Sequence, residues 1–262
     1  MNPTIVNNIK QTLNELETEK QIHILMAIES GSRGWGFPSS DSDYDCRFVY
    51  AQSLEKYLTI GEVTDHISLP VDEIYDVDGW DLKKLLIHIK KSNPTVWEWL
   101  QSPIIYREEK EFREQCMTLA KLYFNEKTTL YHYKSLAYNK VQEIKETALG
   151  KLKAYFYALR SALACDYVLN YHSIPPMEIN QLMESLKLES ELISEIKQFI
   201  ELKATVDEAY MIASLTKLLG YIEKVLLNCD DYLQEAKPTT TLKDTKLLDE
   251  HFRNWVTRWE KL

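Results

Sequence analysis

The sequence predicts an α+β protein in two parts, a small mixed α+β domain followed by an all-helical domain. Three observations lead to this prediction. Short apolar runs typical of strands alternate with helical patterns over the first 106 residues. Long, helically periodic segments then follow one another to the end of the chain. At 262 residues the chain is long enough to bury two cores. We therefore expect domains at residues 1–106 and 107–262.

The elements of the first part follow in order. Apolar residues at helical spacing predict an amphipathic helix over residues 4–20. The nearly continuous apolar run QIHILMAIES is typical of a strand covered on both faces. SDYDCRFVY is a second strand, and HISLPVDEIYDVD a third that Pro70 interrupts. Asp78 is expected to cap the next helix, with Asp81 in its first turn.

The second part is a series of expected helices. Their periodic segments are residues 108–124, 126–149, 151–170, 177–186, 190–203, about 207–234 and about 242–260. Neither an internal repeat nor a low-complexity segment interrupts this series.

Composition and charge limit the functional classes. The net charge of −9 argues against broad nonspecific nucleic-acid binding. The charge is unevenly spread: residues 1–106 carry 9 Lys/Arg against 16 Asp/Glu, and residues 121–160 carry 8 against 3. The first stretch can present carboxylates and the second can receive an anion, unless both are solvated faces.

Cysteine usage and hydropathy indicate the compartment. Four cysteines without a CxxC pair suggest neither a zinc site nor a disulfide framework. The sequence has no apolar run of the roughly 18 residues that a membrane span needs, and its beginning lacks a signal-peptide pattern. A cytoplasmic location without a membrane partner is therefore expected.

The stretch SGSRGWGFPSSDSDYDCRFVY carries the chemistry. Asp43 and Asp45 alternate within a strand pattern and so share one face, while Tyr44 points into the packing. Two carboxylates on one face repel each other unless a cation lies between them, and Mg²⁺ prefers such ligands. Gly31 lets a phosphate approach its backbone, and Ser32 offers a hydroxyl. These residues predict a site for a nucleoside triphosphate and its metal.

The pattern Gly31-Ser32, then Asp43-x-Asp45, resembles the signature of the DNA polymerase β nucleotidyltransferase superfamily. With DVDGWDLKKLL and KSNPTVWEWLQSPIIY, the chain resembles the RNA-repair-associated bacterial and phage branch over residues 25–110, and more loosely to about 170. The resemblance implies a polymerase-β-type mixed sheet with flanking helices, two metal ions (Mg²⁺ or Mn²⁺) and an NTP substrate, with ATP favoured. It also implies transfer of a nucleoside monophosphate with release of pyrophosphate.

The superfamily uses a third carboxylate on a later strand between hydrophobic residues. Asp76 matches this setting, in Tyr75-Asp76-Val77, and is expected to act on the attacking hydroxyl. Asp72 and Asp78 share its strand parity and remain alternatives. The resemblance thus makes Asp43, Asp45 and Asp76 both the catalytic residues and the metal ligands.

Five cationic or aromatic residues complete the candidate site. Arg33 follows the serine and is expected at phosphate, and Arg47 either binds phosphate or balances the local acidic charge. Lys153, Tyr157 and Arg160 lie on one helix face. The resemblance implies that the helical domain closes over the nucleotide or acceptor. It also implies that the two cations of that face bind the triphosphate and that the tyrosine lies near the base. The alternative is an ordinary amphipathic face.

These observations lead to a metal-dependent nucleotidyltransferase that acts on an acceptor hydroxyl. An RNA end is the favoured acceptor, although the sequence shows no RNA-binding module. A protein hydroxyl, as in AMP transferases, and a small molecule are alternatives. A non-catalytic nucleotide sensor or interaction protein is the alternative from another functional class. The presence of all three carboxylates argues against it, because a sensor could lose one of them without harm.

Overall fold

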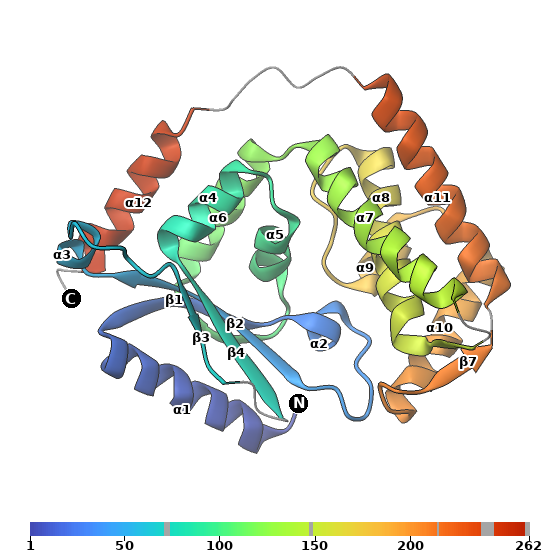
Figure 1. Cartoon of the computed structure of the whole chain (residues 1–262), viewed down its shortest axis with the longest axis horizontal. Coiled ribbons are helices and arrows are strands. Elements are labelled where there is room, and N and C mark those ends of the chain that lie inside the picture. Colours follow the sequence, from blue (N-terminus) through green and yellow to red (C-terminus); the bar gives the residue numbers. More distant parts are fainter. Residues whose placement is uncertain (71–73, 147–148, 214, 237–243, 260–262) are drawn as a thin grey trace. The chain divides into compact units, whose positions relative to one another are not determined.

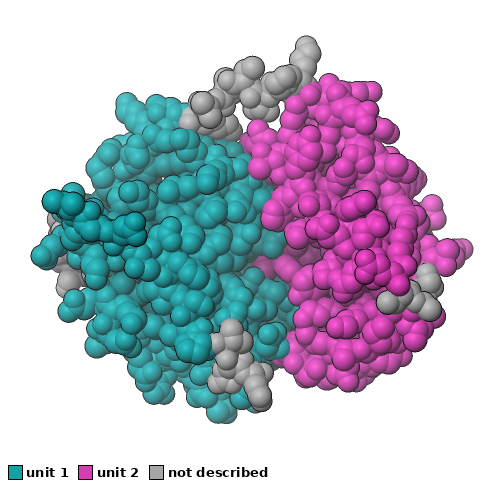
Figure 2. All heavy atoms as spheres, in the orientation of Figure 1, with its two compact units in different colours: residues 1–34, 43–123, 242–262 teal, residues 35–42, 124–241 magenta. Residues whose placement is uncertain are grey.

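The computed structural model describes residues 1–70, 74–146, 149–213, 215–236 and 244–259. These residues form two compact units (Figure 2). The sheet unit comprises residues 1–34, 43–123 and 242–262, and the helical unit comprises residues 35–42 and 124–241. Within the part of the chain that the structure describes, no helix is both long and apolar enough to cross a membrane.

A five-stranded mixed sheet organises the first unit (Figure 1). Its spatial order is β3-β4-β2-β1-β5. Strands β2 and β4 are parallel, and the other neighbouring pairs are antiparallel. The strands are β1 (Ile22–Glu29), β2 (Tyr44–Gln52), β3 (His66–Ser68), β4 (Tyr75–Asp81) and β5 (Ile105–Glu108). The expected α+β class with a mixed sheet is confirmed.

Helices cover both faces of this sheet (Figure 1). Helix α1 (Pro3–Lys20) buries Ile9, Leu13 and Leu16 against one face, to which β2 contributes Tyr44 and Cys46. Alternation along β2 therefore sends Tyr44 and Cys46 toward α1 and Asp45 toward the opposite face. That face is contacted by α4 (Leu82–Lys90) and α6 (Lys110–Tyr123). The unit also contains α3 (Leu54–Tyr57), α5 (Pro94–Gln101) and α12 (Lys246–Trp259).

The expected N-cap of the helix after β4 is wrong by three residues. Asp78 lies within β4, and Asp81 is the N-cap of α4, where its Oδ1 accepts a hydrogen bond from the Lys83 amide at 2.7 Å. The other carboxylate oxygen of Asp81 accepts from Gln52 and Tyr57, so burial of this side chain leaves its oxygens satisfied. The strand continues because long-range pairing with β2 outweighs the local capping signal.

The helical unit is built around α8 (Leu152–Tyr171), which α7 (Glu126–Lys145), α9 (Ile179–Ser185) and α11 (Thr216–Glu235) contact. Helix α10 (Ser190–Thr205) packs against α11. The helix expected from about residue 207 begins only at Thr216. The residues before it include β7 (Met211–Ala213), which pairs with β6 (Leu149–Lys151).

The compact units differ from the boundary expected at residue 106. Helix α6 belongs with the sheet because its buried Phe112 and Cys116 contact α12: Cys116 Sγ lies 3.5 Å from His251 Nε2. Residues 35–42 belong with the helices, where buried Lys203 donates a hydrogen bond to Ser39 Oγ at 2.5 Å. Helical periodicity reports that a segment is a helix but not which core it joins.

Gly79 is expected to be essential for the packing of β4. A Cβ at this position would lie 2.2 Å from the buried Phe48 ring, whereas a Cβ at Gly61 would meet nothing within 4 Å. We expect Gly79→Ala to destabilise the protein by about 1–3 kcal/mol through overpacking. Gly61→Ala is the matched control and should stay within about 0.5 kcal/mol of wild type. Urea denaturation followed by circular dichroism measures both, and equal midpoints would contradict this account.

Acid is expected to weaken the packing of α12. Burial lowers the pKa of His251 to about 4, and its ring stacks on Phe112. Between about pH 6.5 and 4 the unfolded chain therefore binds a proton that the folded chain excludes. The free energy of unfolding thus decreases as the pH is lowered, by about 3 kcal/mol over this range. His251→Leu should lose this part of the acid dependence.

The measurement is urea unfolding followed by tryptophan fluorescence between pH 7 and 4, since Trp255 packs against Phe112. The difference in unfolding free energy between wild type and His251→Leu should change across this range. A difference that stays constant with pH would show that His251 protonates equally in both states.

Candidate active site

Two carboxylates that lie far apart in the sequence meet on one face of the sheet. Strands β2 and β4 are parallel and in register, with Asp45 opposite Asp76. Residues opposite each other in such a pair share a face, and neighbouring strands lie about 4.8 Å apart. Like charges at this distance destabilise a sheet unless a cation offsets them. Asp45 and Asp76 therefore need a cationic partner.

The Gly31-Ser32 turn lies directly against Asp45. Gly31 has a φ of 57° and begins the short helix α2 (Gly31–Trp35). A Cβ at Gly31 would fall 1.9 Å from Asp45 Oδ2, so any other residue here would force this carboxylate out of its position. The Ser30 amide donates to the Asp45 carbonyl at 2.8 Å, which ties the turn to β2. Ser32 is buried.

Glu29 supports Asp45 from inside the protein. This carboxylate is 0% exposed and accepts hydrogen bonds from the Asp45 amide, at 3.0 Å, and from the Tyr106 hydroxyl. Desolvation raises the pKa of Glu29 to about 7, against the opposing effect of the Tyr106 hydrogen bond. Glu29 is not among the site residues predicted from the sequence. The available signal was an acidic residue that ends an apolar strand run directly before the glycine turn.

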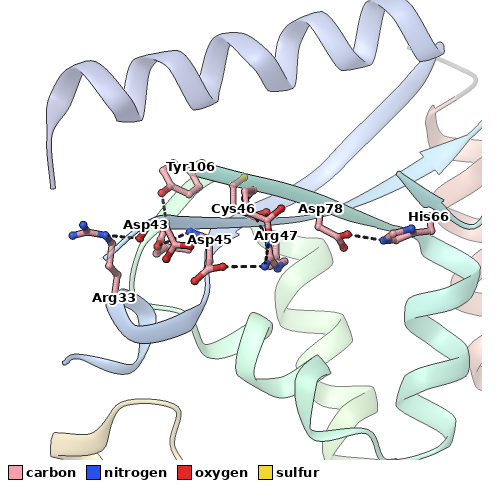
Figure 3. Close-up of polar contacts among 10 residues, drawn as sticks. Arg33, Asp43, Asp45, Cys46, Arg47, His66, Asp78 and Tyr106 are labelled. Atoms are coloured by element: carbon pink, nitrogen blue, oxygen red, sulfur yellow. Dashed lines mark hydrogen bonds and ion pairs between the residues drawn. The ribbon is translucent and has the colours of Figure 1, made fainter. Parts of the chain in front are cut away.

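Arg33 and Asp43 lie beside this turn (Figure 3). Arg33 Nε donates to the Asp43 carbonyl at 2.9 Å, and its guanidinium lies 4.1 Å from the centre of the Tyr44 ring. Asp43 is exposed and immediately precedes β2, so it stands at the end of the strand rather than within it.

Arg47 is the cation that partners the two facing carboxylates. Its Nη2 lies 3.0 Å from Asp45 Oδ1 and 2.8 Å from Asp76 Oδ2. Figure 3 shows the guanidinium reaching Asp45 along the same face of the sheet. Phosphate binding and balance of the acidic charge were the two functions expected for Arg47. These contacts agree with the second.

Among the alternatives for the third carboxylate, Asp78 has a different partner. Asp78 lies opposite Arg47 in the register but pairs with His66 Nε2 at 2.6 Å, farther along β4 (Figure 3). Asp72 lies outside the described residues. Asp76 is thus the alternative that stands beside Asp45.

The donor set suits a hard cation. Carboxylate oxygens are the ligands that Mg²⁺ takes, usually one or two together with substrate phosphates and water. Asp45 and Asp76 form such a pair on adjacent strands. In the described part of the chain, no group of three or more His, Cys, Asp or Glu side chains is gathered closely enough to hold a metal. The pair fits a metal that arrives with phosphate ligands better than a closed protein cage.

The three site residues of the second half lie on α8 in the helical unit. Lys153 forms an ion pair with Glu208, and its ammonium lies 5.8 Å from the centre of the Tyr157 ring. Arg160 is 3% exposed, and its Nε donates to the Met177 carbonyl at 3.0 Å. Tyr157 and Arg160 both contact the Trp35 ring. The helix face expected from the sequence is present, with its cations engaged in contacts inside this unit.

Comparison with known proteins places the chain. The family model described as "RlaP: RNA repair pathway DNA polymerase beta family" matches residues 5–254. "Uncharacterized protein YcgL" of Bacillus subtilis (strain 168) is 37% identical over 225 residues, which is 86% of each chain. A crystal structure of a nucleotidyltransferase-like protein from Exiguobacterium sibiricum covers 94% of this chain and 80% of its own, at 15% identity and a TM-score of 0.30. That likeness is too low to carry an argument.

The family model spans nearly the whole chain, from α1 to α12, and includes the turn, both strands and the helical unit. The chain therefore belongs to the RlaP family, the RNA repair pathway DNA polymerase β family, and is a nucleotidyltransferase of the polymerase β superfamily.

Proposed function

We propose that the protein transfers a nucleoside monophosphate from an NTP to an acceptor hydroxyl, with release of pyrophosphate, and that Mg²⁺ or Mn²⁺ is required. ATP is the favoured donor. The observation that supports this proposal is the register that sets Asp45 beside Asp76, with Gly31 against Asp45. Membership of the polymerase β family supplies the reaction class.

The proposed roles follow from the positions of the residues. Asp45 and Asp76 hold the metal, and exposed Asp43 joins them when the nucleotide contributes its phosphate oxygens. When bound, the metal neutralises charge on the triphosphate and on the leaving pyrophosphate. Gly31 admits a phosphate close to its backbone, and Ser32 and Arg33 supply donors beside it.

The chemical step is a substitution at the α-phosphorus. The acceptor oxygen forms a bond to this phosphorus as the bond to the bridging oxygen of the β-phosphate breaks, and pyrophosphate leaves with that electron pair. We expect Asp76 to orient the acceptor hydroxyl and to accept its proton. Asp43 and Asp45 keep the donor nucleotide in place during this step.

The residues of α8 are expected to differ in role. Lys153 is a suitable triphosphate ligand, since its side chain is 35% exposed and Glu208 is an exchangeable partner. Tyr157 is expected near the base. Arg160 is held by a backbone carbonyl and an aromatic ring, so we expect it to fix α8 in place more than to bind phosphate.

An RNA end is the proposed acceptor, because the family is named for an RNA repair pathway. The test offers each α-labelled NTP with Mg²⁺ or Mn²⁺ to RNA, extract protein and small-molecule acceptors. Label should appear in RNA, and RNA binding should weaken steeply with salt. Label in protein or in a neutral small molecule, insensitive to salt, would replace the RNA acceptor. Metal-dependent NTP binding without transfer to any pool would favour a sensor.

Asp45→Asn and Asp76→Asn are each expected to lower transfer at least about a hundredfold, because each removes a carboxylate that holds the metal, whose positive charge stabilises the reacting phosphate. Asp43→Asn should also abolish transfer. Asp78→Asn is the matched control on the same strand, and it should keep activity within about threefold, since Asp78 pairs with His66. Single-turnover label transfer measures the rates, and circular dichroism checks the fold. Loss of activity in Asp78→Asn with full activity in Asp76→Asn would exchange their roles.

Gly31→Ala is expected to abolish transfer through Asp45. The new methyl would occupy the place of Asp45 Oδ2, and the left-handed backbone at Gly31 would add about 1–2 kcal/mol of strain. Gly220→Ala in α11 meets nothing within 4 Å and serves as the control with unchanged activity. Thermal denaturation separates loss of fold from loss of function. A folded and fully active Gly31→Ala variant would contradict the close approach.

A further inference from the structure

Arg47 makes four hydrogen bonds on the face of the sheet that carries the candidate metal ligands. Its Nη2 donates to Asp45 Oδ1 at 3.0 Å and to Asp76 Oδ2 at 2.8 Å. Its Nη1 donates to the backbone carbonyls of Cys46 at 3.1 Å and Asp76 at 3.3 Å. The side chain is only 19% exposed. One nitrogen of the guanidinium thus bridges the two carboxylates while the other is held by the backbone.

The strand register explains why Arg47 reaches these two residues. Arg47 shares a face with Asp45 because they are two positions apart on β2. Its direct neighbour on β4 is Asp78, but Asp78 is paired with His66 at 2.6 Å. The guanidinium turns instead to the Asp45–Asp76 pair.

A guanidinium and a divalent metal cannot share this pair of carboxylates favourably. Arginine stays protonated in proteins, so its charge does not disappear when a second cation approaches. Two cations a few ångströms apart repel each other strongly in a partly buried site. Any metal that binds Asp45 and Asp76 must therefore displace Arg47 or be repelled by it.

We propose that Arg47 is an internal substitute for the metal: it neutralises Asp45 and Asp76 until a divalent cation and a nucleotide arrive together. The negative charge of the triphosphate compensates for the cation and receives the released guanidinium, so metal binding becomes dependent on nucleotide. This inference rests on the proposed function, since it takes Asp45 and Asp76 as metal ligands. It goes further by assigning Arg47 the control of when they bind metal.

The first test is the affinity for Mn²⁺, measured on the whole chain after its metal has been removed with EDTA. The electron paramagnetic resonance signal of free Mn²⁺ reports how much metal is unbound. Without nucleotide, Arg47→Met should bind Mn²⁺ about tenfold more tightly than wild type, equal to about 1.4 kcal/mol. Arg47→Lys keeps the charge and should stay close to wild type. With a non-hydrolysable ATP analogue, wild type should bind as tightly as Arg47→Met.

The control variant is Arg113→Met. Arg113 lies in the same unit and is 18% exposed; like Arg47 it donates to two backbone carbonyls and pairs with a carboxylate, that of Glu108. Its carboxylate partner is Glu108, whereas Asp45 and Asp76 pair with Arg47, so its loss should leave Mn²⁺ affinity unchanged. A change in Arg113→Met equal to that in Arg47→Met would mean that general loosening of the fold, not removal of the competing cation, alters the affinity, and would overturn the proposal.

Thermal stability supplies a second readout. In EDTA, Arg47→Met should melt below wild type because the two carboxylates then repel each other. Mn²⁺ should raise its Tm more than that of wild type, since the metal restores the missing cation. If Arg47→Met does not fold in EDTA, Arg47→Gln, which keeps hydrogen-bond donors without charge, takes its place in both measurements.

The outcomes separate this inference from the proposed function. Suppose that wild type binds Mn²⁺ through Asp45 but that the neutral Arg47 variant does not bind it more tightly. Arg47 then does not compete with the metal, and the inference fails while the proposed function stands. If, in the presence of the ATP analogue, Asp45→Asn binds Mn²⁺ as tightly as wild type does, the metal site itself is elsewhere. The proposed function then fails together with the inference.

Discussion

The parallel pairing of β2 with β4 is the constraint on which the candidate site depends. In-register pairing sets Asp45 opposite Asp76, and it also places Arg47 where it can bridge them. A slip of one residue would turn Asp76 and Asp78 toward the apolar face beneath α1. That face is filled by Cys46, Val77 and other buried side chains, so burial enforces the register that the chemistry requires.

A second group of contacts fixes Asp45 itself. The buried Glu29 carboxylate holds the Asp45 amide, the Ser30 amide holds its carbonyl, and Gly31 leaves room for its side chain. These contacts come from the end of β1 and the turn after it, which are adjacent to β2 through antiparallel pairing. The Asp45 carboxylate is thus positioned by hydrogen bonds to its backbone, by the Glu29 side chain and by the absence of a Cβ at Gly31. This density of restraint is typical of a group whose placement matters for function.

The chain crosses between its two units more than once. Residues 35–42 leave the sheet unit between the glycine turn and β2 and are held by the helices, through Lys203 to Ser39 and through the Glu208 amide to Asp41. Helix α12 returns to the sheet unit after α11, where it packs against α6. The loop between Gly31 and Asp43 is therefore shaped by the helical core, although both of its ends belong to the sheet.

The sequence by itself determined the α+β class, the strand carrying Asp45, the glycine turn and the helix face of Lys153 and Tyr157. These are local features, written in periodicity and in residue types that few other conformations use. Only the tertiary structure decided that β4 extends past Asp78 to Asp81. It also decided that buried Glu29 accepts a hydrogen bond from the Asp45 amide, and that Arg47 pairs with Asp45 and Asp76. The reason is that strand pairing and burial join residues distant in the chain, and their free energy outweighs local capping and turn preferences wherever the two disagree.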